Sequence, residues 1–411
     1  MSSALSTSPP PSRVAVVDPV RPATATPLWR ALAPICLVVF AEFLAMGLPL
    51  PVLPTHVHDT LGFGAFVVGL VIGAQSWVTL FTRHLAGVRS DARGPAHAVV
   101  PGLVISALAA ALYALSSIVP EPSASLALLV VGRGLLGLGE SLVITGALAW
   151  GVALAGRARA GVVMAWVGIA MYGAMSIGAV LGASIAHHFG FVAMSIAAAL
   201  APLAGLVAAR LARPVAATGG ARLPFRHVAR RIALPGAGLA LAALGFGAIA
   251  SFAVLHFEAR GWSGAALATA AFGAAYVLAR LAFGALPDRL GGARVALASA
   301  AVTALGQVGL WLAPSPALAI AAAGLTGLGF SLVFPSFGVE AVRRVPPESR
   351  GVALGAYAAS FDLALGVGVP LLGLASGALD TGAAFALAAL GALASLVIAL
   401  RLGAARAEVT R

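Results

Sequence analysis

Long apolar runs constrain this chain more than any other feature of its sequence. A helix rises about 1.5 Å per residue, so about 20 apolar residues are enough to cross the hydrocarbon core of a bilayer. The runs therefore predict twelve transmembrane helices. They cover residues 30–54, 65–86, 98–119, 125–154, 161–186, 191–212, 232–256, 264–286, 295–313, 317–342, 351–376 and 383–402.

The composition excludes an ordinary water-soluble protein. Hydrophobic residues make up 61% of the 411 positions and charged residues only 9%, whereas soluble domains carry roughly 25% charged residues. A chain this apolar could not cover its surface with polar groups. The single cysteine, Cys36, excludes an intramolecular disulfide and a cysteine metal cluster. We therefore predict an all-α membrane protein.

The arginines predict how the chain is oriented. All 25 basic residues are arginine, and with the N-terminus in the cytoplasm 23 of them fall on the cytoplasmic side of the twelve spans. Arg260 lies in an outer loop and Arg133 lies within a span. This is the asymmetry of the positive-inside rule, so the net charge of +12 reflects topology and not nucleic-acid binding. We expect a multi-pass protein of a bacterial inner membrane, in contact with the lipid bilayer, with both termini cytoplasmic.

The longest predicted interior loop, residues 213–231, separates six spans from six. The first residues are rich in proline, serine and threonine, a composition typical of disorder. We therefore expect a disordered cytoplasmic tail over 1–27, a six-helix bundle over 28–212, a cytoplasmic linker over 213–231, a second six-helix bundle over 232–402 and a cytoplasmic tail over 403–411.

The two halves contain matching stretches of sequence. "GLLGLGESLV" (134–143) aligns with "GLTGLGFSLV" (324–333) at an offset of 190 residues, and "RHLAGVRSDARG" (83–94) aligns with "RLAFGALPDRLG" (280–291) at an offset of 197. Two matches in the same order indicate a duplicated six-helix unit. This is the parallel repeat of a 6+6 transporter.

On these motifs the chain, over roughly residues 30–402, resembles a transporter of the major facilitator superfamily (MFS). The second matching stretch is similar to the family motif "GxLaDrxGr(k/r)" between helices 8 and 9. The first, between helices 2 and 3, keeps its two glycines and its aspartate but has Arg93 one position late. The helix around Arg133 is similar to an arginine motif of proton-coupled members, and "GLPLPVLPTHVHDTLGF" (47–63) looks like the bacterial drug/proton antiporter branch, especially sugar-efflux-like permeases. The resemblance implies two pseudo-symmetric six-helix halves that work by alternating access.

The matching stretches supply candidates for a cytoplasmic gate. Glycines permit tight turns and close helix approach, and an aspartate at a helix junction can cap exposed N–H groups. Glu340 is expected to form a latch with Arg343, Arg344 or the loop between helices 8 and 9. The candidate gate residues are Arg83, Gly87, Asp91, Gly94, Arg280, Gly284, Asp288, Arg289, Gly291 and Glu340.

Charged residues inside the predicted spans are candidates for proton coupling. Each costs about 2.5 to 3.5 kcal/mol at the centre of a bilayer. The helical rise puts Glu42 about 18 Å from the inner face and Arg133 about 12 Å from the outer face, so we expect the two to meet inside the bundle. Glu42 is then a proton-accepting carboxylate, a binder of cationic substrate, or one partner of a structural ion pair with Arg133.

Arg133 could tune Glu42, hold an anionic or hydroxyl-bearing ligand, or serve structure alone. Glu140 shares a helix face with Arg133, seven residues away, and could pair with Arg83 or Arg157 instead. Asp362 is a second protonatable or substrate-binding group, or it makes a hydrogen bond in helix packing. The neutral candidates for the substrate cavity, each of which ordinary packing would also explain, are Gln75, Trp77, Tyr172, Tyr276, Ser331 and Tyr357.

These observations predict a secondary active transporter. We expect proton-coupled antiport that exports a small organic molecule, a drug-like compound or a sugar, by a monomer. Proton-coupled uptake of a metabolite is the alternative, followed by a non-transporting sensor or an intramembrane enzyme. The sequence contains no P-loop, nucleophile elbow or metal-binding cluster, so we expect no enzymatic activity, no metal and no cofactor, with the proton gradient as the driving force.

Overall fold

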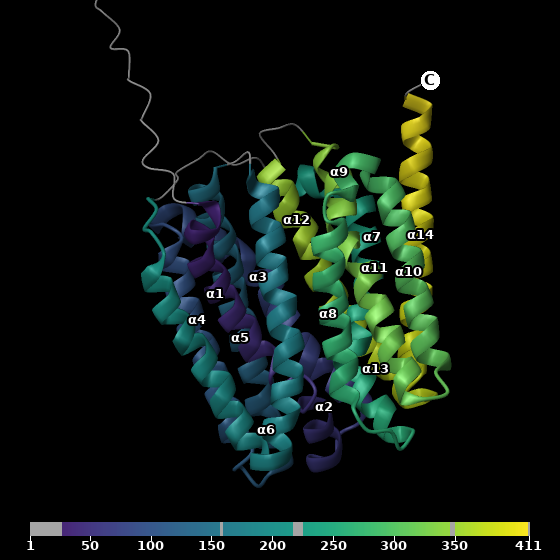
Figure 1. The fold of residues 1–411 in the computed structure, drawn as a ribbon. Helices are drawn as coiled ribbons and strands as arrows, with labels where there is room; N and C mark the ends of the chain where they lie inside the picture. Colours follow the sequence, from purple (N-terminus) through teal and green to yellow (C-terminus); the bar gives the residue numbers. More distant parts are fainter. Residues whose placement is uncertain (1–26, 157–158, 217–224, 346–349, 410–411) are drawn as a thin grey trace, which may run out of the picture.

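Helices account for the regular structure of the computed structural model, which describes residues 27–156, 159–216, 225–345 and 350–409 (Figure 1). The first half of the chain contains α1 (Leu28–Gly47), α2 (Leu53–Thr55), the π-helix η1 (His56–Thr60), α3 (Ala65–Arg93), α4 (Ala96–Ser116), α5 (Pro122–Ala155) and α6 (Ala160–Leu211). The second half contains α7 (Phe225–Ala259), α8 (Ala265–Phe283), α9 (Leu286–Leu290), α10 (Gly292–Leu312), α11 (Pro316–Val342), α12 (Arg350–Leu363), the π-helix η4 (Ala364–Gly368), α13 (Val369–Ala378) and α14 (Ala383–Val409).

The predicted twelve spans are confirmed once α6 is divided. Within the described residues, 11 helices or helix combinations are long and apolar enough to cross a membrane, and α6 alone provides 52 residues. Gly190 interrupts α6 with φ 83° and ψ 172°, a backbone conformation that glycine adopts without a Cβ clash. The chain reverses there, so α6 contributes two spans.

Several helices have different ends from those predicted. α1 ends at Gly47, and Pro49, Pro51 and Pro54 follow in turns and short helical segments, because proline cannot donate the backbone hydrogen bond that a helix needs. Residues 225–231 of the predicted linker belong to α7, and residues 403–409 of the predicted C-terminal tail belong to α14. The predicted disordered tail lies outside the described residues up to position 26.

The helices form two bundles that stand side by side (Figure 1). The first bundle contains α1 and α3 to α6, and the second contains α7 to α14. They meet where α3 packs against α12, η4 and α13, and where α6 packs against α8. α1 begins and α14 ends on the same side of the molecule, at the top of Figure 1. We call this the terminal side and the opposite one the far side.

Toward the far side the two bundles pack closely through small residues. A Cβ atom on Gly69 of α3 would lie only 2.9 Å from the carbonyl oxygen of Val369 in α13. At the other contact, the Ser176 hydroxyl of α6 donates a 2.7 Å hydrogen bond to the carbonyl of Ala270 in α8. Small residues let helix backbones approach where lipid gives no hydrophobic drive for association. Any polar site between the bundles is therefore covered on its far side.

Candidate functional site

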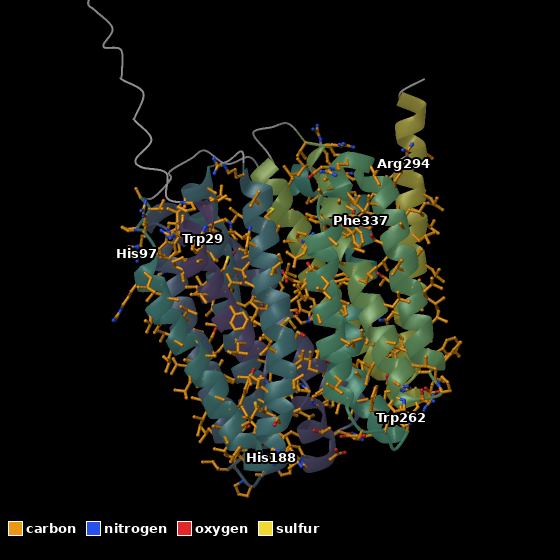
Figure 2. The ribbon with its side chains drawn as sticks, viewed as in Figure 1. Trp29, His97, His188, Trp262, Arg294 and Phe337 are labelled. Atoms are coloured by element: carbon orange, nitrogen blue, oxygen red, sulfur yellow. The ribbon has the colours of Figure 1, made fainter. Side chains whose placement is uncertain are left out.

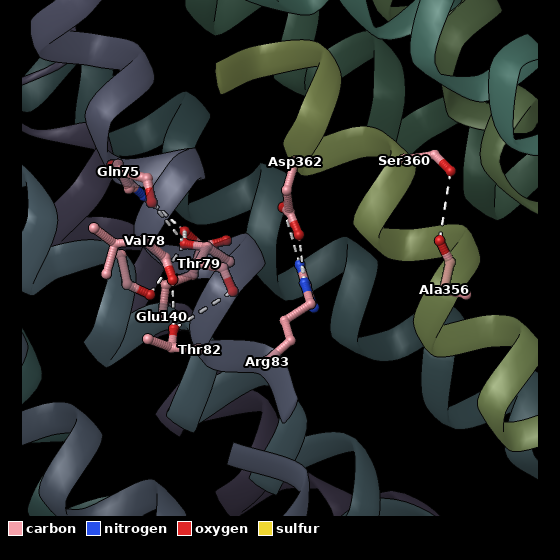
Figure 3. A network of polar contacts seen from close by, with 10 residues as sticks. Gln75, Val78, Thr79, Thr82, Arg83, Glu140, Ala356, Ser360 and Asp362 are labelled. Atoms are coloured by element: carbon pink, nitrogen blue, oxygen red, sulfur yellow. Dashed lines mark hydrogen bonds and ion pairs between the residues drawn. The ribbon is translucent and has the colours of Figure 1, made fainter. Parts of the chain in front are cut away.

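A network of polar side chains lies between α3, α5 and α12 (Figure 3). The Gln75 amide of α3 donates a 2.7 Å hydrogen bond to one carboxylate oxygen of Glu140 in α5. The hydroxyl of Thr79, one turn further along α3, lies 3.3 Å from the same oxygen and 3.0 Å from the Gly137 carbonyl. A buried carboxylate therefore receives hydrogen-bond donors from the neighbouring helix.

An ion pair continues this network into the second bundle. One turn after Thr79, Arg83 of α3 faces Asp362 of α12, and its Nε and Nη2 each contact one carboxylate oxygen. The Nη2 contact is 3.1 Å long. The Asp362 side chain is 3% exposed and that of Arg83 is 20% exposed. Paired, hydrogen-bonded charges are the form in which ions are tolerated away from water, and this pair joins the two halves of the molecule.

The predicted contact between Glu42 and Arg133 is wrong. Glu42 of α1 accepts a 2.6 Å hydrogen bond from Ser106 of α4, and its second carboxylate oxygen has no partner. Arg133 of α5 donates from Nη2 to the Ile72 carbonyl at 3.2 Å, and its Nε and Nη1 have no partner. Both side chains are buried to 1% exposure. Each is placed by the first bundle alone.

Helix packing explains why Glu42 and Arg133 do not meet. Ser106, the partner of Glu42, packs against Gly139 of α5. Gly139 is six residues beyond Arg133, a rise of about 9 Å along the helix. The predicted depths assumed straight helices perpendicular to the membrane, and they left undetermined which way each side chain faces.

A small cavity at the boundary between the bundles contains some of the predicted residues. Arg133 and Gln75 line it from the first bundle and Ser251 of α7 lines it from the second. The Oε1 of Gln75 and the hydroxyl of Ser251 have no hydrogen-bond partner, and neither have two nitrogens of Arg133. Unsatisfied groups around one cavity are suited to binding water or a polar ligand. The whole lining is Met46, Leu50, Ile72, Gly73, Gln75, Ser76, Arg133, Phe246, Gly247, Ala250, Ser251, Leu365 and Val369.

Tyr172 and Tyr276 lie together at the second contact between the bundles. Their ring centroids are 3.8 Å apart, across the contact between α6 and α8. Phe272 and Phe330 extend this group, with ring centroids 6.1 Å apart. Arg280, one turn beyond Tyr276, has its guanidinium 5.7 Å from the Tyr276 ring centroid. An aromatic cluster with one cation therefore lies at this contact, with Tyr172 from the first bundle and the other members from the second.

The other neutral candidates are placed by packing. Trp77 is 36% exposed, stacks on Phe81 and does not line the cavity. The Tyr357 hydroxyl donates to the Phe334 carbonyl at 2.8 Å. Ser331 is fully buried in α11 and also lies outside the cavity lining. Nothing in their contacts assigns these three residues to a binding site.

The first gate stretch is helical and not a loop. α3 continues to Arg93, and Gly94 ends it with φ 93°, so Gly87 lies within the helix. Arg83 does not hold a loop in water, because it reaches Asp362 inside the molecule. The side chain of Asp91 lies outside the described residues, as does Arg157.

The second gate stretch forms the short helix α9. Gly284 lies before it, Asp288 and Arg289 are exposed on it, and Gly291 follows it with φ 91°. Glu340 of α11, and not Asp288, accepts a hydrogen bond from the first turn of α10, at the Ala293 amide, 3.2 Å away.

Glu340 also pairs with the two arginines predicted from the sequence. It lies 3.5 Å from the Nη1 of Arg343 and 3.4 Å from that of Arg344, so the predicted pairing is confirmed. Together with its contact to α10, this pairing holds the terminal end of α11 against the next helix. Its part in a gate stays a prediction.

Sequence reasoning missed Thr79, Ser106 and Ser251. For Thr79 a signal was present, because Gln75, Thr79 and Arg83 are spaced four residues apart and so share one helix face. Ser106 and Ser251 lie in apolar runs with no such pattern, and only packing reveals their neighbours.

Comparison with known proteins relates this chain to one family of membrane transporters. A family model described as Major Facilitator Superfamily matches residues 35–266 and 236–410. An uncharacterised MFS-type transporter of Burkholderia mallei (strain SAVP1) is 45% identical over 361 residues, which cover 87% of this chain and 88% of the relative. An uncharacterised MFS-type transporter of Pseudomonas aeruginosa (strain UCBPP-PA14) is 43% identical over 370 residues, covering 90% of this chain and 92% of the relative.

Two solved structures share the fold at low sequence identity. The human organic anion transporter MFSD10 (TETRAN) has a TM-score of 0.71 at 15% identity, covering 91% of this chain and 100% of its own. The nucleoside transporter NupG has a TM-score of 0.70 at 16% identity, covering 90% of this chain and 99% of its own. Likeness at this level of identity concerns the fold alone.

Proposed function

Because this chain belongs to the Major Facilitator Superfamily, a family of membrane transporters, we propose that it is a proton-coupled antiporter that exports a small organic molecule, drug-like or sugar-like. The two bundles rock about the site between them and expose it to one side of the membrane at a time. The terminal side faces the cytoplasm of a bacterial inner membrane, in agreement with the positive-inside distribution of arginines.

The observation that carries this proposal is the Arg83–Asp362 ion pair beside Glu140. Arg83 and Glu140 both belong to the first bundle, whereas Asp362 belongs to the second. Arg83 lies one turn from Thr79, which contacts Glu140, so Glu140 offers the arginine a second carboxylate within its own bundle. An arginine in proteins stays protonated. The choice of its partner therefore depends on which carboxylate is charged.

This arrangement links proton binding to movement of the bundles. A proton that binds to Asp362 removes its charge, and Arg83 then loses the partner that holds it to α12. Turning toward Glu140 keeps Arg83 paired and frees the two bundles from one mutual contact. When the proton leaves, Asp362 regains its charge and draws Arg83 back. Substrate and proton thereby bind to alternative arrangements of the two bundles, which is the minimum that exchange requires.

The membrane potential supplies enough free energy for such an exchange. One charge that crosses 100 mV releases about 2.3 kcal/mol, equivalent to about a fifty-fold concentration ratio. One proton per substrate is therefore sufficient for useful export. Glu42 is a second protonatable group in this scheme, since one of its carboxylate oxygens is buried without a partner.

A transport screen tests the proposal. Everted vesicles that contain the protein are given an acid lumen, and labelled drug-like compounds and sugars are offered outside. Export by antiport predicts accumulation in the acid lumen and its collapse with a protonophore. Accumulation only with the opposite gradient would mean uptake, and accumulation that ignores the gradient would refute proton coupling.

Variants then locate the proton carrier. We expect Asp362→Asn to lose gradient-driven accumulation, with Asp380→Asn as the matched control, because Asp380 accepts bonds from the amides of Gly382 and Ala383 in its own bundle. Glu42→Gln is run beside them. Wild-type accumulation rates in Glu42→Gln would remove Glu42 from the scheme, and wild-type rates in Asp362→Asn would refute the proposed coupling.

A further inference from the structure

The polar network has a counterpart in the second half of the molecule with different chemistry. The offsets of 190 and 197 residues that relate the halves assign a partner to each member of the network. The pairs are Gln75 with Phe272, Thr79 with Tyr276, Arg83 with Arg280, Glu140 with Phe330 and Asp362 with Tyr172. Arginine is retained, and the two carboxylates, the amide and the threonine are all replaced by aromatic side chains.

The aromatic counterparts lie close together, as the members of the polar network do. The rings of Tyr172 and Tyr276, the counterparts of Asp362 and Thr79, are 3.8 Å apart across the contact of α6 with α8, and the Asp362–Arg83 pair crosses the contact of α12 with α3. Phe330 is 6.1 Å from Phe272 and 6.3 Å from Tyr276 between ring centroids, as Glu140 lies beside Gln75 and Thr79. The repeat therefore preserves the position of the site and changes what it can bind.

Arg280 is a cation like its counterpart Arg83, but among the described residues it has no carboxylate beside it as Arg83 has Asp362. It is 9% exposed, its Nε has no hydrogen-bond partner, and its Nη2 lies 3.5 Å from the Tyr276 hydroxyl. In the described part of the chain no carboxylate lies within ion-pair distance of it. Where Arg83 faces Asp362, the equivalent place opposite Arg280 belongs to Tyr172, which is neutral. A buried cation without a partner is costly unless an anion reaches it.

The helix opposite Arg280 presents a glycine to the guanidinium and no side chain. Gly168 of α6 has no side chain, and a Cβ atom built there would lie 3.7 Å from both the Arg280 Nη2 and the Tyr276 hydroxyl. The backbone of α6 therefore lies close to the guanidinium, with room at Gly168 for at most a methyl group in van der Waals contact. Two donors, the guanidinium and the Tyr276 hydroxyl, meet at this glycine, and the Tyr276 ring contacts the rings of Tyr172, Phe272 and Phe330.

We propose that this cluster is the substrate subsite and that it binds a small aromatic carboxylate. The carboxylate pairs with Arg280 and accepts a hydrogen bond from Tyr276, and the ring of the substrate packs against Tyr172 and Phe330. A charge-assisted bond in a buried site is among the stronger polar interactions, and aromatic pairs add to apolar burial. The inference rests on the proposed transport function and narrows its substrate class.

In this proposal one boundary between the bundles binds the proton and the other binds the substrate. The boundary of α3 with α12 carries the acids that a proton needs, and the boundary of α6 with α8 carries the cation and rings that an aromatic anion needs. Both lie where the bundles meet, so one rocking movement rearranges both.

Equilibrium binding tests the subsite. Isothermal titration of the purified full chain in detergent, at one pH and without any gradient, is carried out with benzoate, 2-naphthoate and indole-3-carboxylate. Each is compared with its neutral amide. We expect wild-type protein to bind at least one carboxylate about tenfold or more tightly than its amide, the size of an added charged hydrogen bond. Equal affinity for acid and amide throughout the panel, or no binding of any acid, overturns the proposal.

Variants then identify the arginine that produces the preference for acid over amide. Arg280→Gln is expected to abolish the preference for acid over amide, Arg280→Lys to retain part of it, and the exposed Arg294→Gln to behave as wild type (Figure 2 shows Arg294 on the terminal side). Arg133→Gln tests the alternative site, because Arg133 lines the small cavity between the bundles. A preference that survives Arg280→Gln, or one that Arg133→Gln alone removes, overturns the assignment. If Arg280→Gln does not fold, Arg133→Gln still decides: loss of the preference in that variant overturns the assignment to Arg280, and retention supports it.

Failure of this inference and failure of the proposed function give different results. Acid-selective binding without gradient-driven transport would refute proton coupling and leave the subsite standing. Proton-driven transport of neutral or cationic compounds, with no acid-selective binding, would refute the subsite and leave the coupling standing.

Discussion

Asp362→Asn is the substitution with the largest expected consequence for how the bundles are held together. Asp362 is 3% exposed and bonds Arg83 through both carboxylate oxygens. Breaking one partner of a buried ion pair costs about 3 to 5 kcal/mol, and the lower end applies here because an asparagine can still accept one hydrogen bond. About 3 kcal/mol corresponds to a shift of a hundredfold or more in the ratio of two conformations.

Such a shift is measurable as a distance between the bundles. Spin labels at Arg93→Cys and Arg294→Cys, two exposed positions on the terminal side, report on it in a Cys36→Ala background. Because the ion pair crosses from α3 to α12, we expect Asp362→Asn to add a second, clearly populated distance. The double variant Arg83→Gln/Asp362→Asn removes both charges and is expected to perturb the distribution less than either single change.

The matched control is Asp380→Asn, which neutralises a carboxylate whose hydrogen bonds stay within the second bundle. It is expected to leave the distance distribution as in the wild type. A distribution in Asp362→Asn that matches wild type, or effects of the two single variants that simply add in the double variant, would refute the view that this pair holds the bundles together.

Three further outcomes follow from the packing. Ser106→Ala leaves Glu42 without its donor and is expected to lower thermal stability by about 1 to 3 kcal/mol; an unchanged melting temperature would contradict this. Gly373→Leu is expected to block transport and shift the distance between the bundles, because a Cβ there already meets the backbone of Ala65 at 2.6 Å; wild-type transport would contradict it. Burial lowers the pKa of His56, so the folded state favours neutral imidazole, and stability is expected to fall as pH drops below about 6.5; His56→Phe should lose that dependence in thermal melts at pH 5 and 8.

The spans and the duplication could be predicted from the sequence because both follow from local patterns. Apolar length predicts a span, and arginine position predicts which end faces which side. The predicted spans 161–186 and 191–212 leave a turn between them, and α6 reverses there at Gly190. What the sequence did not indicate is the form of the turn, in which one glycine with a positive φ joins two otherwise continuous helices.

The partners of the buried charges could not be predicted in the same way. Helical rise converts position in the chain to depth, but the contact also depends on helix tilt and on the face that each side chain occupies. Glu42 and Arg133 were matched by depth and turned out to have different partners. Arg83 and Asp362 are 279 residues apart in the chain, and the packing of α3 against α12 is what brings them together.

The proposal depends most on one claim: the charges of Asp362 and Glu140 couple proton binding to the rocking of the two bundles. The most direct measurement compares two modes of transport in the same proteoliposomes: accumulation driven by a pH gradient, and exchange of labelled for unlabelled substrate without a gradient. For Glu140→Gln and Asp362→Asn we predict that gradient-driven accumulation is lost while substrate exchange continues. Accumulation at wild-type rates in both variants, with wild-type dependence on the gradient, would contradict the account.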